Sequence, residues 1–307
     1  MDDSVATMHA LGGGIAVPRL GYGAMQLAGS RVLGPPEDVP KAVAVLRQAV
    51  ELGVRFFDTA NAYGPRTVNQ LIGEALSPFA EDVIVGNKVG VRRTPKGHWR
   101  TDHHPEFIRQ QVEDAARDLR ASISRLTYLR LGGDGQATPV DVPLEEALGA
   151  LIDLRDQGKI THIGLSGASP EALRQALRMT PIAAVQNRYN LVDRSGAEVL
   201  ADCERLGIAF VPFFPLVAGK LGEMPELVAP AHRLGVGNST VALAWLLRRS
   251  SVMIPIPGTK SLEHLRENVT ASEVAAELTT EEVGQLTGLI YEGHATLGQM
   301  AEALYFH

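Results

Sequence analysis

The chain has 307 residues, of which 45% are hydrophobic and 21% are charged, and its formal net charge is −6. The composition is typical of a soluble globular enzyme, and the acidic balance argues against a nucleic-acid-binding or anionic-membrane surface. The single cysteine, Cys203, excludes an intrachain disulfide and is expected in the core. No apolar run reaches the ~18 residues that a membrane span requires. The start of the chain lacks the apolar region of a signal peptide, so we expect a cytoplasmic protein.

Segments with the patterns of strands and helices alternate along most of the chain. Residues 41–52 carry apolar side chains at helical spacing and stop before Gly53, whereas residues 54–57 are apolar and partly β-branched, as in a buried strand. The predicted strands are residues 19–24, 54–57, 82–88, 125–131, 160–165, 182–186, 208–212 and 252–256. The predicted helices are residues 41–52, 67–76, 105–121, 143–157, 169–178, 195–206 and 239–249, followed by 261–270 and 279–291.

This alternation predicts one closed (β/α)₈ TIM barrel. Strands that alternate with helices run parallel and are joined by right-handed crossovers. Eight such units without a clear linker favour a barrel over an open sheet, and a single domain covering residues 1–307. The glycines at 12–14, between two short apolar runs, predict an N-terminal hairpin at the barrel floor. The last two predicted helices are additions to the barrel.

Three polar residues stand near the ends of two early strands. Asp58 and Tyr63 lie in F-D-T-A-N-A-Y-G, and Lys88 ends a later apolar run. A phenol beside a buried ammonium and a carboxylate releases its proton more readily than a free phenol, so it can protonate a carbonyl oxygen at neutral pH. Barrel enzymes carry their chemistry at the C-terminal ends of the strands. The trio therefore predicts carbonyl reduction there, together with other residues at or just after strand ends: Arg130, Ser166, Gln186 and Phe213.

Several motifs, in a fixed order along nearly the whole chain, resemble those of the aldo-keto reductases. They are R-L-G-Y-G-A-M-Q-L-A-G, F-D-T-A-N-A-Y-G, N-K-V-G, H-I-G-L-S-G, V-Q-N-R-Y-N, P-F-F-P-L, V-A-L-A-W-L-L-R-R and I-P-G-T-K-S-L-E-H-L-R-E-N-V. Each motif is weakly specific alone, but their joint occurrence is highly specific. The sequences G-P-P-E-D and P-F-F-P-L are similar to those of the bacterial pyridoxal-reductase-like branch of the family.

The resemblance implies an NADPH-dependent oxidoreductase that reduces an aldehyde or ketone to an alcohol. Asp58 and Lys88 would hold and polarise Tyr63, and Tyr63 would protonate the carbonyl oxygen as hydride arrives from the nicotinamide. Family members usually carry a histidine where this chain has Arg130. An arginine does not give up its proton. Arg130 would instead donate hydrogen bonds to the carbonyl, add positive potential or bind an anionic group of the substrate. The alternative is that Arg130 is only an ion-pair partner in the barrel mouth.

The resemblance also implies the residues that hold NADPH. Gly21 and Gly23 do not form a dinucleotide fingerprint, because Gln26 stands where the third glycine belongs. In the family, the counterparts of Ser166 and Gln186 hold the nicotinamide carboxamide. The nicotinamide ring stacks on the side chain of the residue that corresponds to Phe213. Gly167 occupies the position at which family members usually have an asparagine that helps to hold the carboxamide. The loop that wraps the pyrophosphate matches Leu216, Ala218, Gly219 and Leu221.

The adenosine end of the cofactor is implied near the predicted helix 261–270, which follows the last strand. Gly258, Thr259, Lys260 and Ser261 open this helix, and a helix N-terminus favours phosphate. By resemblance the 2′-phosphate would contact Lys260 and Arg266, and two cations there favour NADPH over NADH. The adenine would lie near Glu267 and Asn268.

The polar segment 92–104, which follows Lys88, is expected to be a loop forming a wall of the substrate pocket, with Trp99 as a contact. His103 and His104 lack partners for a zinc site, so we expect no metal, and His162 is expected to be structural. Two alternatives to the reductase stay open: a Schiff-base aldolase using Lys88, and a non-catalytic, NADPH-binding regulatory subunit. For the reductase, a pyridoxal-like or natural-product carbonyl compound is the expected small-molecule substrate.

Overall fold

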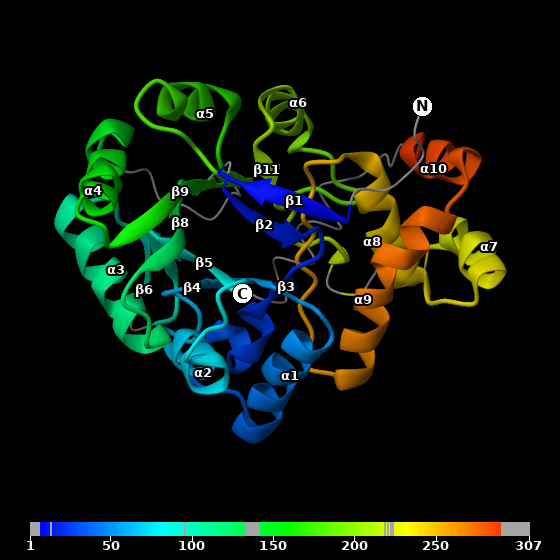
Figure 1. The fold of residues 1–307 in the computed structure, drawn as a ribbon, viewed down its shortest axis with the longest axis horizontal. Coiled ribbons are helices and arrows are strands. Elements are labelled where there is room, and N and C mark those ends of the chain that lie inside the picture. The colour runs from blue at the N-terminus through cyan, green and yellow to red at the C-terminus, as the bar shows by residue number, and fades with distance from the viewer. Residues whose placement is uncertain are drawn as a thin grey trace.

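A parallel sheet that curls into a barrel forms the centre of the computed structural model, which describes residues 7–12, 14–94, 96–132, 142–217, 219, 221 and 224–289. Seven strands are hydrogen-bonded in the order β11-β10-β9-β8-β5-β4-β3, and all their pairs are parallel. Their bounds are β3 Tyr22–Gly23, β4 Phe56–Ala60, β5 Ile84–Val89, β8 Ser124–Arg130, β9 Ile160–Ser166, β10 Ala184–Gln186 and β11 Ala209–Phe210. The helices surround this sheet in a ring (Figure 1).

Residues 252–257 fill the eighth place and close the barrel. Phe210 exchanges two backbone hydrogen bonds of 2.8 Å with this segment, while the amides of Gly21 and Gly23 donate to the carbonyls of its two prolines at 2.9 and 3.1 Å. The predicted strand 252–256 is therefore not a regular strand, because proline has no amide to donate to a ladder. The (β/α)₈ barrel itself is confirmed.

Two glycines allow the first and last segments of the barrel to approach closely. A Cβ atom on Gly23 would lie 2.6 Å from the Ile256 carbonyl oxygen, and one on Gly258 would lie 2.6 Å from the Gly23 carbonyl oxygen. Only glycine avoids this clash at either position. This junction between the first and last segments is referred to below as the seam.

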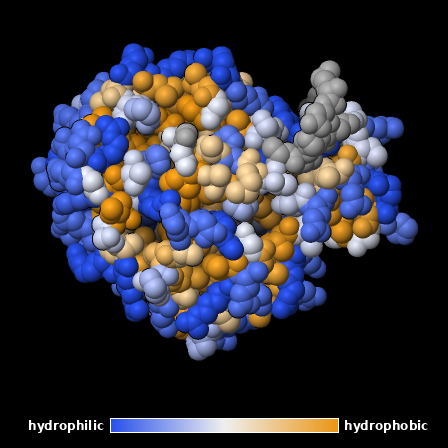
Figure 2. Space-filling model, viewed as in Figure 1, coloured by the Kyte–Doolittle hydropathy of each residue, from blue (hydrophilic) through white to orange (hydrophobic). Residues whose placement is uncertain are grey.

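The predicted N-terminal hairpin is confirmed. Strand β1 (Met8–Leu11) pairs antiparallel with β2 (Ile15–Pro18) and lies across one end of the barrel (Figure 1). Leu11 and Val17 join the apolar cluster that fills the barrel interior. On this face of the molecule, hydrophilic residues cover most of the rim and hydrophobic residues gather toward the middle (Figure 2).

Most predicted helices lie within a few residues of the observed ones. The helices are α1 Val39–Glu51, α2 Thr67–Leu76, α3 Pro105–Leu119, α4 Leu144–Asp156, α5 Pro170–Leu177, α6 Ala197–Leu206, α7 Pro225–Leu234, α8 Asn238–Arg249, α9 Leu262–Glu277 and α10 Thr280–Thr287, with short 3₁₀ turns at Ala24–Leu27 and Ser30–Val32. Helix α9 is longer than predicted, and the predicted residues 290–291 lie outside the described part of the chain. Helix α7 was not predicted, since its internal Pro230 reads as a helix breaker.

The largest apolar cluster lies between the sheet and the outer helices, and it contains Cys203. Burial raises the pKa of the Cys203 thiol to about 12, so this side chain is an inert part of the core. Within the described part of the chain, no helix combines the length and apolar character needed to cross a membrane. The cytoplasmic location expected from the sequence stays a prediction.

Candidate active site

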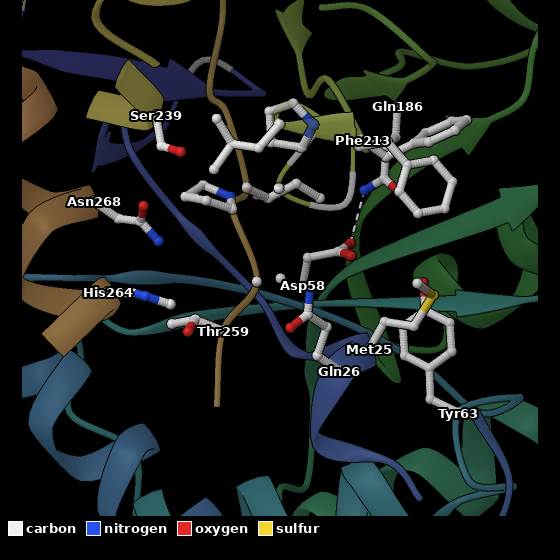
Figure 3. Close-up of a pocket in the computed structure, with 18 of the residues that line it drawn as sticks. Met25, Gln26, Asp58, Tyr63, Gln186, Phe213, Ser239, Thr259, His264 and Asn268 are labelled. Carbon is white, nitrogen blue, oxygen red and sulfur yellow. Dashed lines mark hydrogen bonds between the residues drawn. The ribbon is translucent and has the colours of Figure 1, made fainter. Parts of the chain in front are cut away.

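A pocket of about 450 Å³ lies at the C-terminal ends of the strands. It extends from Tyr63 and Phe213 at one end to His264 and Asn268 at the other (Figure 3). Of the residues singled out in the sequence, the pocket is lined by Asp58, Tyr63, Lys88, Arg130, Ser166, Gln186, Phe213, Leu216, Gly219, Gly258, Thr259, Glu267 and Asn268. The structure thus brings together residues from all parts of the barrel mouth.

The centre of this pocket is a buried ion pair. Lys88 Nζ lies 2.6 and 2.7 Å from the two carboxylate oxygens of Asp58, and both side chains are only 4% exposed. Asp58 lies inside β4 rather than after it, so the predicted strand 54–57 ended too early. Successive residues of a strand face opposite sides, which turns both Asp58 and Lys88 into the barrel mouth.

Tyr63 completes the trio from the loop between β4 and α2. Its hydroxyl oxygen lies 3.2 Å from Lys88 Nζ, which donates to it, and Nζ is 5.1 Å from the centre of the phenol ring. Lys88 also donates to the Thr59 carbonyl at 3.3 Å. One ammonium group therefore joins the carboxylate, the phenol and the strand backbone.

Gln186 makes a contact that the sequence did not indicate. Its side-chain amide donates to Asp58 at 2.7 Å (Figure 3). The Asp58 carboxylate is thus held by a charged donor and a neutral one, and both are buried. This arrangement compensates a charge that burial alone would penalise.

Arg130 ends β8 and lies over the ring of Trp99, with its guanidinium carbon 4.9 Å from the ring centre. The guanidinium carbon of Arg93 is 4.2 Å from the same centre, and the edge-on ring of Tyr63 is 6.3 Å away. Trp99 is not among the residues lining the pocket. It supports Tyr63 and Arg130 from behind.

The segment expected to be a polar loop is instead partly a hairpin. Strand β6 (Val91–Arg93) pairs antiparallel with β7 (Trp99–Thr101), and Arg93 is opposite Trp99. Arg93 fixes the hairpin further by donating to the carbonyls of Val32 and Gly97 at 2.6–3.0 Å. Cation–π contact and backbone pairing together order a segment whose composition is polar.

His103 follows this hairpin and is buried. One of its ring nitrogens, Nε2, lies 2.8 Å from the Arg130 carbonyl oxygen. Burial lowers the pKa of His103 below the usual 6.5, although the hydrogen bond to Arg130 and the nearby Asp102 act in the opposite direction. A neutral ring whose Nε2 carries the proton suits this contact.

We expect His103→Gln to weaken the pH dependence of stability. The unfolded chain takes up a proton near pH 6.5 and the native state only at lower pH, so the histidine destabilises the native state as the pH falls below 6.5. Glutamine keeps a donor but does not titrate. Between pH 7.5 and 5.5 the wild type should lose up to ~1.4 kcal/mol per pH unit more than the variant, measured by urea denaturation. His9 and His162, whose pKa values are also lowered, retain their share of the dependence. Equal losses in both proteins would contradict the prediction.

Some residues assigned to the cofactor by resemblance lie beside the pocket rather than in its lining. Lys260 and Arg266 are exposed, near the end of the pocket lined by His264 and Asn268. The Ser261 hydroxyl accepts from the His264 amide at 3.3 Å and so begins α9. Leu221 is buried in the core, and Ala218 lies outside the described residues.

Nine lining residues are not among the site residues predicted from the sequence: Gly23, Met25, Gln26, Phe214, Pro215, Ser239, Ile256, Pro257 and His264. Met25 and Gln26 lie in the 3₁₀ turn that directly follows β3 and could have been found by the strand-end rule. Ser239 and His264 come from the N-terminal turns of α8 and α9. No local pattern marks them, because only the tertiary fold places them at the pocket.

Among the described residues, no group of three or more histidine, cysteine, aspartate or glutamate side chains could hold a metal ion. The polar centre of the pocket consists instead of an ammonium, a carboxylate, a phenol, a guanidinium and a carboxamide. Such a set can donate protons and stabilise an oxyanion. The fold and the site together define a barrel enzyme.

Comparisons with known proteins give its family. A model described as the aldo/keto reductase family matches residues 19–290. The chain is 40% identical over 278 residues to pyridoxine 4-dehydrogenase of Escherichia coli (strain K12), with 90% of this chain and 96% of that protein covered.

Solved structures agree with this result. A thermostable aldo-keto reductase crystallised with the inhibitor epalrestat has a TM-score of 0.80 and 28% identity, over 92% of this chain and 99% of the other. An aldo-keto reductase from Klebsiella pneumoniae in complex with NADPH has a TM-score of 0.77 and 24% identity, over 92% and 94% of the two chains. The chain belongs to the aldo/keto reductase family and is an oxidoreductase.

Proposed function

We propose that this protein reduces an aldehyde or ketone to the alcohol, with NADPH as hydride donor and Tyr63 as proton donor. The observation that carries the proposal is the Tyr63 hydroxyl 3.2 Å from Lys88 Nζ, at the mouth of a barrel and inside the pocket. Because Lys88 is itself fixed by both oxygens of Asp58, the hydroxyl is held before any substrate arrives.

The pocket residues fit an extended dinucleotide. The pocket runs from Tyr63 to Asn268 (Figure 3). Gly219, with a φ of 87°, has open space beside it where a pyrophosphate can approach the backbone. Phe213 would offer a ring face to the nicotinamide, Ser166 would offer a hydroxyl to its carboxamide, and the N-terminus of α9 would favour the 2′-phosphate. When bound, NADPH supplies the hydride.

Three side chains of this protein stabilise the negative charge that the reaction creates. Hydride addition to the carbonyl carbon puts negative charge on its oxygen, and Tyr63 transfers its proton to that oxygen. The Lys88 ammonium stabilises the resulting phenolate, and Asp58 keeps the ammonium in place. One hydride and one proton convert the carbonyl to an alcohol, and the phenolate regains a proton from solvent.

We expect NADPH to bind at least ~10-fold more tightly than NADH, because a cation paired with the 2′-phosphate contributes ~1.4 kcal/mol or more. Titration of tryptophan fluorescence with each nucleotide measures both dissociation constants. Lys260→Met should reduce the preference, whereas Lys159→Met, which removes an exposed pair with Glu113 at the opposite end of β9, should not. Equal, millimolar affinities of the wild type for both nucleotides would contradict the cofactor assignment.

Arg130 is proposed to donate hydrogen bonds to the substrate. Arg130 lines the same pocket as Tyr63. The E. coli relative is named for a reaction of pyridoxine, which supports a small, polar, aromatic carbonyl compound such as pyridoxal as the substrate. Arg130→His should change kcat/KM unequally, by ~10-fold or more for substrates able to accept two hydrogen bonds and less for simple aromatic aldehydes. Identical kinetics with every substrate would exclude a role for Arg130.

The two alternatives are less well supported by the contacts of Lys88. A Schiff-base aldolase needs a neutral amine, and such an amine would lose the ion pair of 2.6 Å with Asp58. Covalent trapping of a carbonyl substrate on Lys88 by borohydride would favour the aldolase. A non-catalytic subunit has no use for a phenol and ammonium so held, and absence of turnover with every carbonyl compound would favour that reading.

A further inference from the structure

Behind the trio, on the outer face of the sheet, lies a continuous chain of buried polar side chains. Thr59 follows Asp58 on β4 and Asn87 precedes Lys88 on β5, so both point away from the barrel mouth. They are directly opposite each other in the β4–β5 register. Helices α2 and α3 cover this side of the sheet (Figure 1).

The hydrogen bonds between these polar side chains share one direction, because each side chain donates to the next residue in the series. The Thr59 hydroxyl donates to Asn69 of α2 at 2.8 Å, the Asn69 amide donates to Asn87 at 3.1 Å, and the Asn87 amide donates to Asn61 at 2.7 Å. The Asn61 amide then donates to the Gln111 carbonyl at 2.8 Å. A backbone carbonyl only accepts, so this last contact fixes the orientation of every amide before it.

Gln111 of α3 extends the chain to the residues that follow Lys88. Its side-chain oxygen accepts from the Gly90 amide at 2.7 Å, and its side-chain amide donates to the Val91 carbonyl at 2.9 Å. All five side chains are buried, with exposures between 0% for Thr59 and 6% for Gln111. We name Thr59, Asn61, Asn69, Asn87 and Gln111 the amide chain.

The amide chain passes through the loop that carries Tyr63, at Asn61. The Asn61 backbone amide donates to the Lys88 carbonyl at 3.2 Å, the Tyr63 amide donates to the Ala60 carbonyl at 3.0 Å, and the Arg66 amide donates to the Asn61 carbonyl at 2.8 Å. Asn61 therefore connects the Tyr63 loop to the strand of Lys88 through both its backbone and its side chain. A shift of this residue changes the separation of the phenol and the ammonium.

We propose that the amide chain positions Tyr63 against Lys88 and so sets the rate of proton donation. Apolar side chains would fill the space between sheet and helices without leaving buried polar groups to satisfy. Instead, three of the five members stand within two residues of Asp58, Tyr63 or Lys88 in the sequence. Their shared direction lets each bond strengthen the next and resists a flip of any single amide. The inference rests on the proposed function, in which Tyr63 is the proton donor.

The first test is Asn87→Leu, which keeps the number and branching of the side-chain heavy atoms and removes the middle of the amide chain. We expect kcat to fall by ~10- to 100-fold, because a displacement of about 1 Å at a reacting group costs this much, while the dissociation constant for NADPH changes less than ~2-fold. Hydrogen exchange of the peptide spanning residues 57–71 should become at least ~10-fold faster, because the loop loses the side-chain hydrogen bonds that hold it and its backbone opens more often.

A milder pair guards against a variant that fails to fold. Thr59→Val removes only the first hydrogen bond, whereas Thr59→Ser keeps the hydroxyl, so the serine variant should restore the kcat and exchange rate that the valine variant loses. The matched control is Thr180→Val. Thr180 is 4% exposed and accepts from Arg155 far from the pocket, so this change lowers stability without altering kcat or exchange in residues 57–71.

The outcomes are decisive in both directions. A fall in kcat with unchanged NADPH binding and faster exchange around Tyr63 supports the positioning role. Unchanged exchange in residues 57–71, or a loss of kcat no larger than in Thr180→Val, overturns it. If the wild type reduces no carbonyl compound, the proposed function fails, but the exchange experiment still decides whether the amide chain holds the Tyr63 loop.

Discussion

Tyr63→Phe should reduce kcat by ~10²- to 10⁴-fold, the range attributed to a positioned general acid. The change removes only the hydroxyl that Lys88 contacts at 3.2 Å and leaves the phenyl ring against Trp99. NADPH affinity should therefore stay within ~2-fold of the wild type. Stopped-flow oxidation of NADPH in a single turnover measures the chemical step apart from product release.

Tyr128→Phe is the matched control. Tyr128 lies in the same barrel, but its buried hydroxyl has no hydrogen-bond partner among the described residues. Burial, with the nearby Asp58 carboxylate, raises the pKa of Tyr128 well above its ordinary value, so the hydroxyl stays protonated. Removing it eliminates an unsatisfied group, and stability should be equal or higher with kcat little changed. Equal turnover of Tyr63→Phe and the wild type would refute the proton donor.

The second large effect is expected for Lys88→Met. Removing one partner of a buried ion pair leaves an uncompensated charge, and the free energy of unfolding should fall by ~3–5 kcal/mol. Turnover should fall by at least ~10²-fold, because the phenolate loses its stabilising cation. Urea denaturation measures the first effect and single-turnover kinetics the second.

A double variant and a surface pair test the physical cause. Asp58→Asn combined with Lys88→Met removes both charges, so it should be less destabilised than the sum of the two single variants. Arg109 forms an ion pair of 2.8 Å with Asp153, but both side chains are well exposed. Arg109→Met should therefore cost less than ~1 kcal/mol. Additive effects at positions 58 and 88 would mean that the pair is not coupled.

The barrel was predictable from the sequence because its strands are short apolar runs between amphipathic helices. Prediction failed where tertiary contacts outweigh local pattern. Residues 252–256 look like a strand, yet Pro255 within them and Pro257 just after them interrupt the ladder. The hairpin of Trp99 looks like a polar loop, yet the guanidinium of Arg93 packs on the indole ring. Helix α7 tolerates Pro230, although proline normally breaks a helix.

The site was predictable where strand ends converge and hidden where the fold alone brings residues together. Asp58, Lys88 and Arg130 could be selected from the sequence, because the active sites of such barrels lie at the C-terminal ends of the strands. His264 reaches the pocket from a helix far along the chain. The amide chain was missed for another reason: a single buried asparagine carries no periodic signal, and only its partners on other elements reveal it.

The seam of the barrel has a consequence for how the molecule responds to its ligand. Gly23, Ile256 and Gly258 are part of the seam and also line the pocket. A nucleotide bound in this pocket would contact both terminal segments of the barrel, where proline has removed part of the backbone ladder. Binding of the nucleotide then holds the seam together, where the barrel closes least regularly. At a concentration 100 times the dissociation constant, it adds ~2.7 kcal/mol to the stability of the native barrel.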